Sequence, residues 1–187
     1  KDKNAVYIGV GKLIDSLVKF SVYSGSKKVL SLKKYVINEI VNAQEPDGYI
    51  GNMIPGSRMC KLWDVHEMGY IIFGLLQDYL VYSNTKSLLA AEKAADYIIK
   101  NWSMLPPDWD EQTNVKKYVA VTGLPYTLLI LFKVTGKKHY YDFCLKQLNL
   151  LNWNPGIIIG RRKFIEGHVY AYLSMCLAQL ELYKQQK

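Results

Sequence analysis

The sequence predicts an all-α protein built from helical hairpins. Three observations predict it: apolar residues recur with helical spacing, lysine-rich turns recur along the chain, and strand signals are nearly absent. In residues 29–41, "VLSLKKYVINEIV", the apolar positions fit a period of 3.6 residues and not of 2. The segment "GIIIG" at 156–160 reads as a short extended piece of loop. We expect helices over residues 4–23, 27–43, 65–83, 86–102, 118–134, 138–151 and 165–185.

The predicted helices form a repeat. Each unit has an apolar helix, a short polar turn rich in lysine, and a second helix. The turns "YSGSKK", "YSNTKS" and "VTGKKH" place Gly25, Asn84 and Gly136 at helix ends. Glycine and asparagine accept the left-handed conformation that closes a helix, so we expect each to be a C-terminal cap. The repeats lie near residues 4–43, 65–102 and 118–151, and a fourth first helix lies at 165–185.

Connections between repeats are much longer than the turns within them. They cover residues 44–64, 103–117 and 152–164, whereas each internal turn has about three residues. In an array of antiparallel hairpins, all long connections emerge at the same end. Because binding residues are concentrated on loops above a rigid scaffold, we expect function at this end. All four tryptophans, Trp63, Trp102, Trp109 and Trp153, also lie there.

Composition excludes several classes of protein. The 187 residues have a net charge of +8, but the positive charges are mostly lysines spread over many segments, unlike the basic patches of nucleic-acid-binding proteins. The longest apolar run, "YTLLILF", is too short to span a membrane. Three cysteines at unrelated spacings predict neither a disulfide framework nor a metal site. The first residues carry no targeting signal and read as the beginning of a domain, so the compartment stays open.

The loop that begins "EPDGY" contains the first candidate ligand contacts. Pro46, Asp47 and Gly48 are typical of a tight turn, and a turn needs no further function. Tyr49 and the residues after it extend the loop beyond what a turn requires. We therefore expect Asp47 and Tyr49 to face a ligand. Trp63, at the end of the same loop, presents an indole that can stack on a sugar ring.

Two histidines at predicted helix starts are the next candidates. In "WDVHE", Asp64 and Glu67 have the spacing of a capping box, although Glu67 is also a candidate contact. His66 has no part in such a cap, and a neutral imidazole there can bond a ligand hydroxyl. "FIEGHVY" repeats the arrangement at His168. The positions 18 residues before each turn residue, or before Gln186, are Tyr7, His66, Tyr118 and His168, and we expect these side chains to point into one mouth.

The segments "AQEPDGYIG" and "WDVHEMGYIIFGLLQDYLVYSNTKSLLAAEKAADYI" resemble glycoside hydrolase family 127, the β-L-arabinofuranosidase-like proteins. "LLILFKVTGKKHYYDF" and "EGHVYAYLSMCLAQLELY" resemble later units of the same family. The resemblance covers nearly the whole chain. It implies an (α/α)6 barrel, or toroid, of which residues 1–187 supply about half: three hairpins and one more inner helix. The chain is then a single domain or a fragment of one.

The resemblance also implies a sugar site and a mechanism. His66 and His168 fall on histidines that contact the sugar in the family, with the "PDGY" loop near them. Family catalysis resembles a retaining reaction with a zinc-bound cysteine thiolate as nucleophile and a glutamate as acid/base. These residues fall beyond the last helix here, and Cys60, Cys144 and Cys176 match none of them. We therefore expect zinc in a full-length family member, and neither metal ligands nor catalytic residues in this chain.

Three functions remain open from the sequence. The first is part of a glycoside hydrolase acting on L-arabinofuranosyl or related bonds, with a carbohydrate substrate and no nucleic-acid or membrane partner. The second is a non-catalytic carbohydrate-binding toroid, and the third is a helical-repeat scaffold for protein partners. An apolar groove along the second helices would favour the scaffold. Half a toroid leaves apolar flanks uncovered, so we also predict self-association. The expected sugar contacts are His66, His168, Tyr49, Trp63, Asp47 and Glu67.

Overall fold

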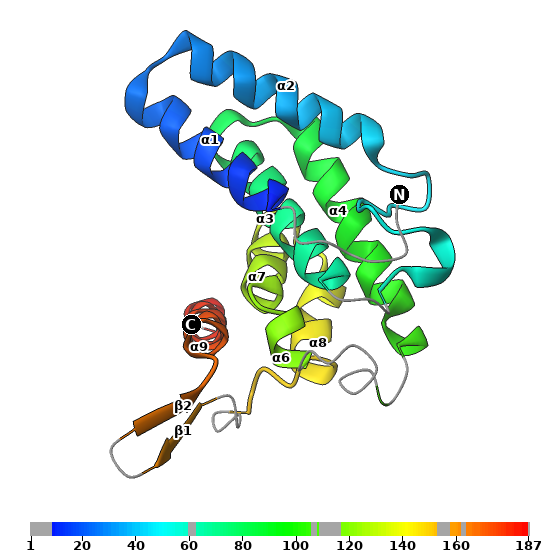
Figure 1. The fold of residues 1–187 in the computed structure, drawn as a ribbon, viewed down its shortest axis with the longest axis vertical. Coiled ribbons are helices and arrows are strands. Elements are labelled where there is room, and N and C mark those ends of the chain that lie inside the picture. The colour runs from blue at the N-terminus through cyan, green and yellow to red at the C-terminus, as the bar shows by residue number, and fades with distance from the viewer. Residues whose placement is uncertain are drawn as a thin grey trace.

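The computed structural model describes residues 9–59, 63–105, 108, 117–152, 158–161 and 164–186. This part of the chain is helical apart from one two-stranded hairpin, which confirms the all-α class (Figure 1). The α-helices are α1 (Val10–Ser24), α2 (Lys27–Ala43), α3 (Asp64–Tyr82), α4 (Thr85–Asn101), α6 (Lys117–Ala120), α7 (Leu124–Thr135), α8 (Lys138–Lys146) and α9 (Val169–Gln185). Two 3-10 turns, η1 (Pro55–Ser57) and η2 (Trp102–Met104), and strands β1 (Ile158–Arg161) and β2 (Phe164–Gly167) complete the described elements.

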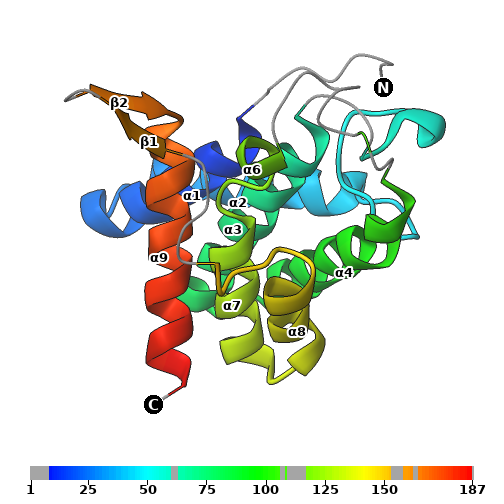
Figure 2. The same ribbon diagram turned by 90° about the horizontal axis from the view of Figure 1, so that it is seen from below.

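The helices form two layers. The first helices of the repeats pack side by side in the order α1, α3, α7 and α9, and each of the first three pairs with its second helix, α2, α4 or α8. The row of first helices is curved, and α9 lies at the end of the curve opposite α1 (Figure 1). The start of α1, the loop after α2 and the β hairpin all lie at one end of the helices, and the C-terminus lies at the other (Figure 2). The predicted loop-rich end is therefore present.

Most predicted helix ends are correct to within one or two residues. Gly25 and Gly136 cap α1 and α7 in the left-handed conformation, with φ of 60° and 70°. The prediction for Asn84 was wrong. Ser83 adopts the left-handed conformation (φ 54°) and closes α3, whereas Asn84 is extended and precedes α4. Residues 4–8 of the first predicted helix lie outside the described residues.

Two predicted helices are interrupted or shortened. The segment 118–134 is divided into α6 and α7 because Gly123 has a φ of +84°, and Pro125 then enters the first turn of α7. The segment 138–151 ends as a helix at Lys146, and the chain then turns through Asn149, which has a φ of 50°. Tertiary packing therefore overrides helical periodicity at both places.

The segment before α9 is extended and not helical, which corrects the predicted start at residue 165. β1 and β2 form an antiparallel hairpin with Ile158 opposite Gly167 and Arg161 opposite Phe164. Gly167 has a φ of 124°, a conformation that suits glycine, and the chain then turns into α9 (Figure 2). The hairpin therefore delivers residue 168 to the loop-rich end.

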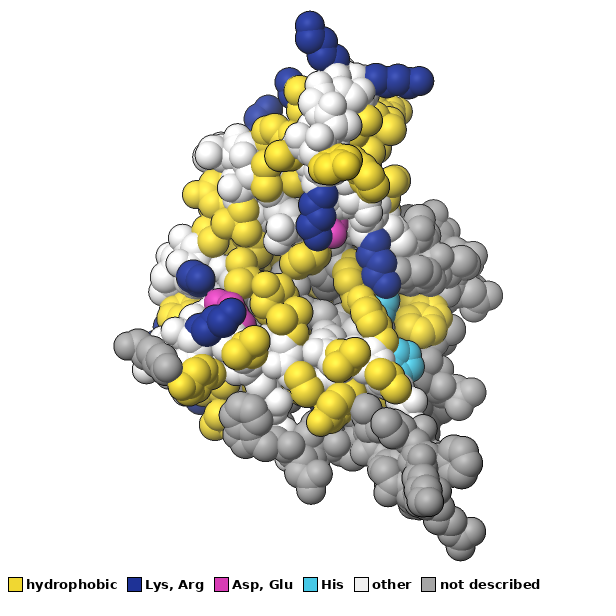
Figure 3. Space-filling view, turned by 90° about the vertical axis from the view of Figure 1, so that its left-hand side faces the viewer, with side chains coloured by type: hydrophobic (Ala, Val, Ile, Leu, Met, Phe, Trp, Pro, Cys, Tyr) yellow, Lys and Arg dark blue, Asp and Glu magenta, His cyan; other side chains and the backbone are white. Residues whose placement is uncertain are grey.

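The curved row of first helices leaves apolar side chains on an open face. Figure 3 shows hydrophobic side chains running along this face. A cavity of about 300 Å³ lies between α3, α7 and α9. A second cavity, of about 370 Å³, lies between the second helices α4 and α8, but its lining includes His139, Asp142 and Lys146, so it is not the apolar groove that would favour a scaffold. None of the described helices is long and apolar enough to cross a membrane. Self-association stays a prediction, and the exposed apolar residues of α9 are Val169, Tyr170, Leu173, Leu177, Leu180 and Tyr183.

Candidate functional site

His66 lies in the first turn of α3 and is 6% exposed. Its Nδ1 is 3.2 Å from the carbonyl oxygen of Val119 in α6. Because a carbonyl oxygen accepts and does not donate, Nδ1 carries the proton and Nε2 is the acceptor nitrogen. The pKa of His66 is lowered to about 4: burial is the main cause, the charges of Lys12 and His168 add to it, and the hydrogen bond to the Val119 carbonyl partly opposes them. The ring is therefore neutral near pH 7.

His168 precedes α9 and is exposed. Its Nδ1 accepts a hydrogen bond of 3.0 Å from the backbone N–H of Ala171, so the imidazole serves as the N-terminal cap of α9. An Nδ1 that accepts has no proton, and Nε2 then carries it. The two histidines thus adopt opposite tautomers: Nε2 of His66 accepts, and Nε2 of His168 donates.

The structure brings these two histidines, about 100 residues apart, to one place. The ring of Tyr70 packs against His66 at 4.9 Å between centroids, and the Tyr70 hydroxyl is hydrogen-bonded to that of Tyr170. The ring of Tyr170 lies 6.4 Å from that of His168. The ammonium of Lys12 lies over both tyrosine rings, 4.4 Å from the Tyr70 centroid and 5.2 Å from the Tyr170 centroid. Figure 3 shows two histidine side chains close together beside a basic side chain.

Trp63 belongs to the same cluster. It precedes α3 in a left-handed conformation, with a φ of 69°, and is partly exposed. Its ring meets that of His66 edge-on, with 5.2 Å between centroids. Trp63, His66 and Tyr70 thus form a continuous aromatic wall along the start of α3. Trp109 and Trp153 lie outside the described residues, and Trp102 is buried against Phe143.

The capping box predicted for Asp64 and Glu67 is absent from the start of α3. Both carboxylate oxygens of Glu67 accept the backbone N–H of Gly9, at 3.1 and 3.0 Å. Glu67 is 6% exposed, and this contact ties the start of α1 to α3. The Asp64 carboxylate, at the first position of the helix, bonds outside the helix instead. Glu67 therefore lies beside the histidine cluster with an evident role in holding α1.

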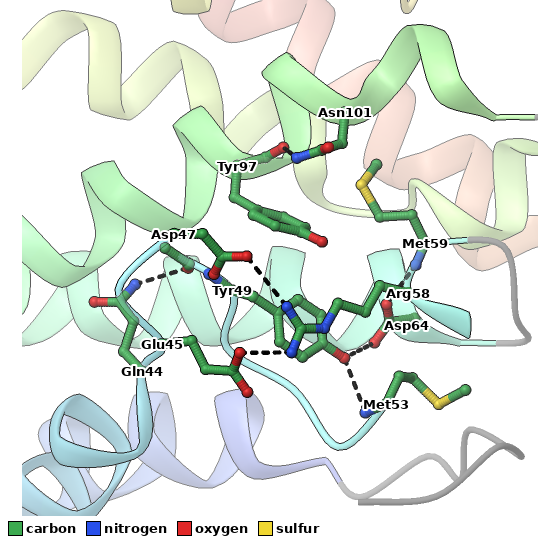
Figure 4. Close-up of polar contacts among 11 residues, drawn as sticks. Gln44, Glu45, Asp47, Tyr49, Met53, Arg58, Met59, Asp64, Tyr97 and Asn101 are labelled. Atoms are coloured by element: carbon green, nitrogen blue, oxygen red, sulfur yellow. Dashed lines mark hydrogen bonds and ion pairs between the residues drawn. The ribbon is translucent and has the colours of Figure 1, made fainter. Parts of the chain in front are cut away.

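Tyr49 and Asp47 form hydrogen bonds with residues of the loop between α2 and α3 and with the start of α3 (Figure 4). Tyr49 is fully buried, and its hydroxyl donates to Asp64 at 2.7 Å and accepts the Met53 N–H at 2.9 Å. Burial and the neighbouring Asp64 carboxylate both raise the pKa of Tyr49. The Asp47 carboxylate accepts the Tyr49 N–H at 3.0 Å and a bond of 3.2 Å from Arg58. These contacts give Tyr49 a structural role within the loop, and its predicted ligand contact stays a prediction.

Arg58 also stabilises this loop through contacts with Tyr49, Glu45 and Asp47. Its guanidinium stacks 4.0 Å from the centroid of the Tyr49 ring and pairs with Glu45 at 2.6 Å (Figure 4). The second carboxylate oxygen of Asp64 accepts the N–H of Met59 at 2.7 Å. The loop between α2 and α3 is thus a preformed structure that sets the position of Trp63 and the start of α3.

Residues 8–149, most of the chain, match the sequence model of a family described as the β-L-arabinofuranosidase GH127 catalytic domain. The chain belongs to this family. Comparisons with curated proteins and with solved structures gave no match. GH127 membership makes glycoside hydrolysis of arabinofuranosyl bonds the associated chemistry and a carbohydrate the associated substrate.

The described cysteines do not fit the zinc–thiolate centre that the family implies. Cys144 is fully buried in α8, its thiol donates to the Pro125 carbonyl, and burial raises its pKa. Cys176 lies in α9, and Cys60 is outside the described residues. Within the described ranges, no three His, Cys, Asp or Glu side chains are grouped as metal ligands would be.

Sequence reasoning found both histidines of the cluster and missed three other residues. Lys12, Tyr70 and Tyr170 carry the contacts that join α1, α3 and α9. Tyr70 is four residues after His66, so helical spacing alone places it on the same face. With 15 tyrosines in the chain, that spacing did not distinguish it. Lys12 was one of many lysines, and its position depends on how α1 packs.

The low pKa of His66 predicts an acid-sensitive fold. The folded-state pKa of about 4 lies below the ordinary value of about 6.5, so the unfolded chain binds more protons between these pH values. This contribution to stability is complete above pH 6.5 and is lost as the pH falls toward 4, by roughly 2–4 kcal/mol. Urea unfolding from pH 4 to 7 measures it. We expect His66→Gln to flatten this slope and His139→Gln to keep it; an unchanged slope in His66→Gln would contradict the assignment.

Proposed function

We propose that this GH127 chain binds an L-arabinofuranosyl or related sugar residue at the loop-rich end, between His66 and His168. The proposal rests on one observation: the two imidazoles lie in the same cluster and adopt opposite tautomers. A sugar hydroxyl both donates and accepts, so it matches an acceptor Nε2 on His66 and a donor Nε2 on His168. Neighbouring Trp63 supplies an aromatic surface for the C–H face of the ring.

Burial and neutrality support this pairing. A buried neutral imidazole bonds a hydroxyl without the desolvation cost that a buried charge carries. The wall of Trp63 and Tyr70 excludes water from one side of His66. Asp47, Tyr49 and Glu67 support the site through the loop and the start of α1. In this proposal, the chain supplies sugar contacts of a glycoside hydrolase and not its nucleophile.

Sugar titration of the 187-residue chain tests the proposal. Methyl β-L-arabinofuranoside is added, and binding is followed by ligand-observed NMR. We expect His66→Ala and His168→Ala each to weaken binding about 5–10-fold, the size of one lost hydrogen bond. Released sugar is measured in the same samples, and we expect none from the chain alone.

His139→Ala is the matched control. His139 lies on α8, is bonded to Asp96 at 2.8 Å, and belongs to none of the contacts of the cluster. Circular dichroism and thermal unfolding show whether each variant keeps the fold. If His66→Ala and His168→Ala lower the melting temperature and leave sugar binding equal to that of His139→Ala, the histidines are structural and the proposal is refuted.

A further inference from the structure

The two histidine-bearing segments depend on a small junction between three helices. α9 packs mainly on α7, where the Ser174 hydroxyl accepts the N–H of Gly123 at 2.9 Å. At the loop-rich end, α9 reaches α3 through the hydrogen bond between the Tyr170 and Tyr70 hydroxyls. Tyr170 is 50% exposed and Tyr70 is 8% exposed, so this hydrogen bond joins an exposed side chain of α9 to a buried side chain of α3.

Each tyrosine is coupled to one histidine. Tyr70 lies one helical turn after His66 with the rings in contact, and Tyr170 follows His168 by two residues in the first turn of α9. A displacement of either ring would therefore move the neighbouring imidazole. The β hairpin enters α9 at Gly167, whose φ of 124° is a conformation that suits glycine and sets the direction in which α9 begins.

Lys12 joins α1 to the same junction. Its ammonium lies over the Tyr70 and Tyr170 rings at 4.4 and 5.2 Å, within the range of a cation–π contact. Besides burial, the Lys12 charge disfavours protonation of His66, which shows that the two groups act on each other. After burial, Lys12 thus contributes to keeping His66 neutral, and it contacts both tyrosine rings of the junction.

We propose that Lys12, Tyr70 and Tyr170 are positioning residues, which hold α9 against α3 so that His66 and His168 face the same ligand. The inference rests on the proposed function for its ligand, a furanosyl sugar, but the geometry of the junction stands without it. Tyr70 and Tyr170 act through the bond they share, so removing either hydroxyl should have the same effect as removing both.

The test uses Tyr70→Phe, Tyr170→Phe and the double variant in the full chain. Histidine nitrogens are labelled with ¹⁵N, and long-range proton–nitrogen spectra report the tautomers of His66 and His168. We expect both single variants to shift the His66 and His168 signals and to weaken binding of methyl β-L-arabinofuranoside about 3–10-fold. The double variant should bind no more weakly than either single one. Lys12→Met, which keeps the apolar stem, should raise the pKa of His66 and weaken binding about 2–5-fold.

Tyr126→Phe is the control. Tyr126 lies in α7 and borders the cavity between α3, α7 and α9, as Tyr70 and Tyr170 do. Its ring centroid is 6.3 Å from that of Phe73, and it takes no part in the Tyr70–Tyr170 bond. It should leave the histidine spectra and sugar binding unchanged. Unshifted histidine signals in Tyr170→Phe, or losses that add in the double variant, would overturn the junction. If the unmodified chain binds no sugar, the proposed function fails, and the histidine spectra still decide the junction.

Discussion

Replacing Asp78 by alanine is expected to destabilise the chain by about 3–5 kcal/mol, because the change leaves a buried ammonium without its partner. Asp78 is fully buried and Lys33 is 3% exposed, with 2.5 Å between the ammonium and the carboxylate. The second Asp78 oxygen accepts bonds of 2.7 Å from both Asn84 and Ser87. Lys33 also lies 3.8 Å from the centroid of the Tyr82 ring. One carboxylate thus connects α2, α3 and the start of α4.

Denaturant unfolding followed by circular dichroism measures the loss. Asp142→Ala is the control, because Asp142 pairs with Lys138 and Lys146 at the surface and its removal should leave the midpoint nearly unchanged. The double change Asp78→Leu with Lys33→Met should recover much of the stability, since it removes both buried charges. If Asp78→Ala were as mild as Asp142→Ala, the pair would contribute far less than its burial indicates.

The helical repeat was predictable because its signals are local. The glycines at residues 25 and 136 and the apolar period of 3.6 act within a few residues of the helix ends that they determine. The end of α3 shows the limit of such local signals, because Ser83 closes the helix and not Asn84 as predicted. Asparagine tolerates the left-handed conformation better than serine, but the Asn84 side chain donates a hydrogen bond to Asp78, a contact that only tertiary packing determines.

Only one strand of the pair before α9 had a local signal: "GIIIG" at 156–160 was predicted to be extended, and residues 158–161 form β1. The segment "FIEG" shows no alternation long enough to identify a strand, and its pairing depends on "IIGR" returning from the opposite direction. The break at Gly123 had a local signal in the Gly-Leu-Pro sequence, but the helical pattern on both sides concealed it. Elements that depend on contacts between segments are thus the ones that the sequence did not reveal.

The candidate site shows the same division. His66 and His168 were found because each begins a helix of the repeat, and the repeat places helix starts at one end. Tyr49 was interpreted as a ligand contact because the turn alone does not require it. Its hydroxyl is instead bonded to Asp64, 15 residues later, a partner that no local pattern indicates. The structural partners of Tyr49 and the position of Lys12 escaped the sequence for one reason: side-chain partners are set by tertiary packing.

Gly11→Ala is expected to cost at least about 3 kcal/mol, at the upper end of the range for overpacking, because a Cβ at this position has no room. It would lie 2.1 Å from the carbonyl carbon of Tyr70 and 2.3 Å from its oxygen. These are backbone atoms of α3, so no rotation of a side chain relieves the contact. On the facing helix, a Cβ on Gly74 would lie 2.6 Å from the Gly11 oxygen. The two glycines therefore allow α1 and α3 to pack with their backbones in contact.

The displacement should also reach the candidate site, because α1 carries Lys12 beside Gly11 and its start is bonded to Glu67. We expect Gly11→Ala to lower the unfolding midpoint and to shift the His66 signal as Lys12 leaves the tyrosine rings. Gly56→Ala is the matched control, because a Cβ there meets no atom within 4 Å. A Gly11→Ala chain as stable as the Gly56→Ala chain would show that α1 and α3 are not in backbone contact. The position of Lys12 over Tyr70 and Tyr170, which depends on the same packing of α1 on α3, would then also be wrong.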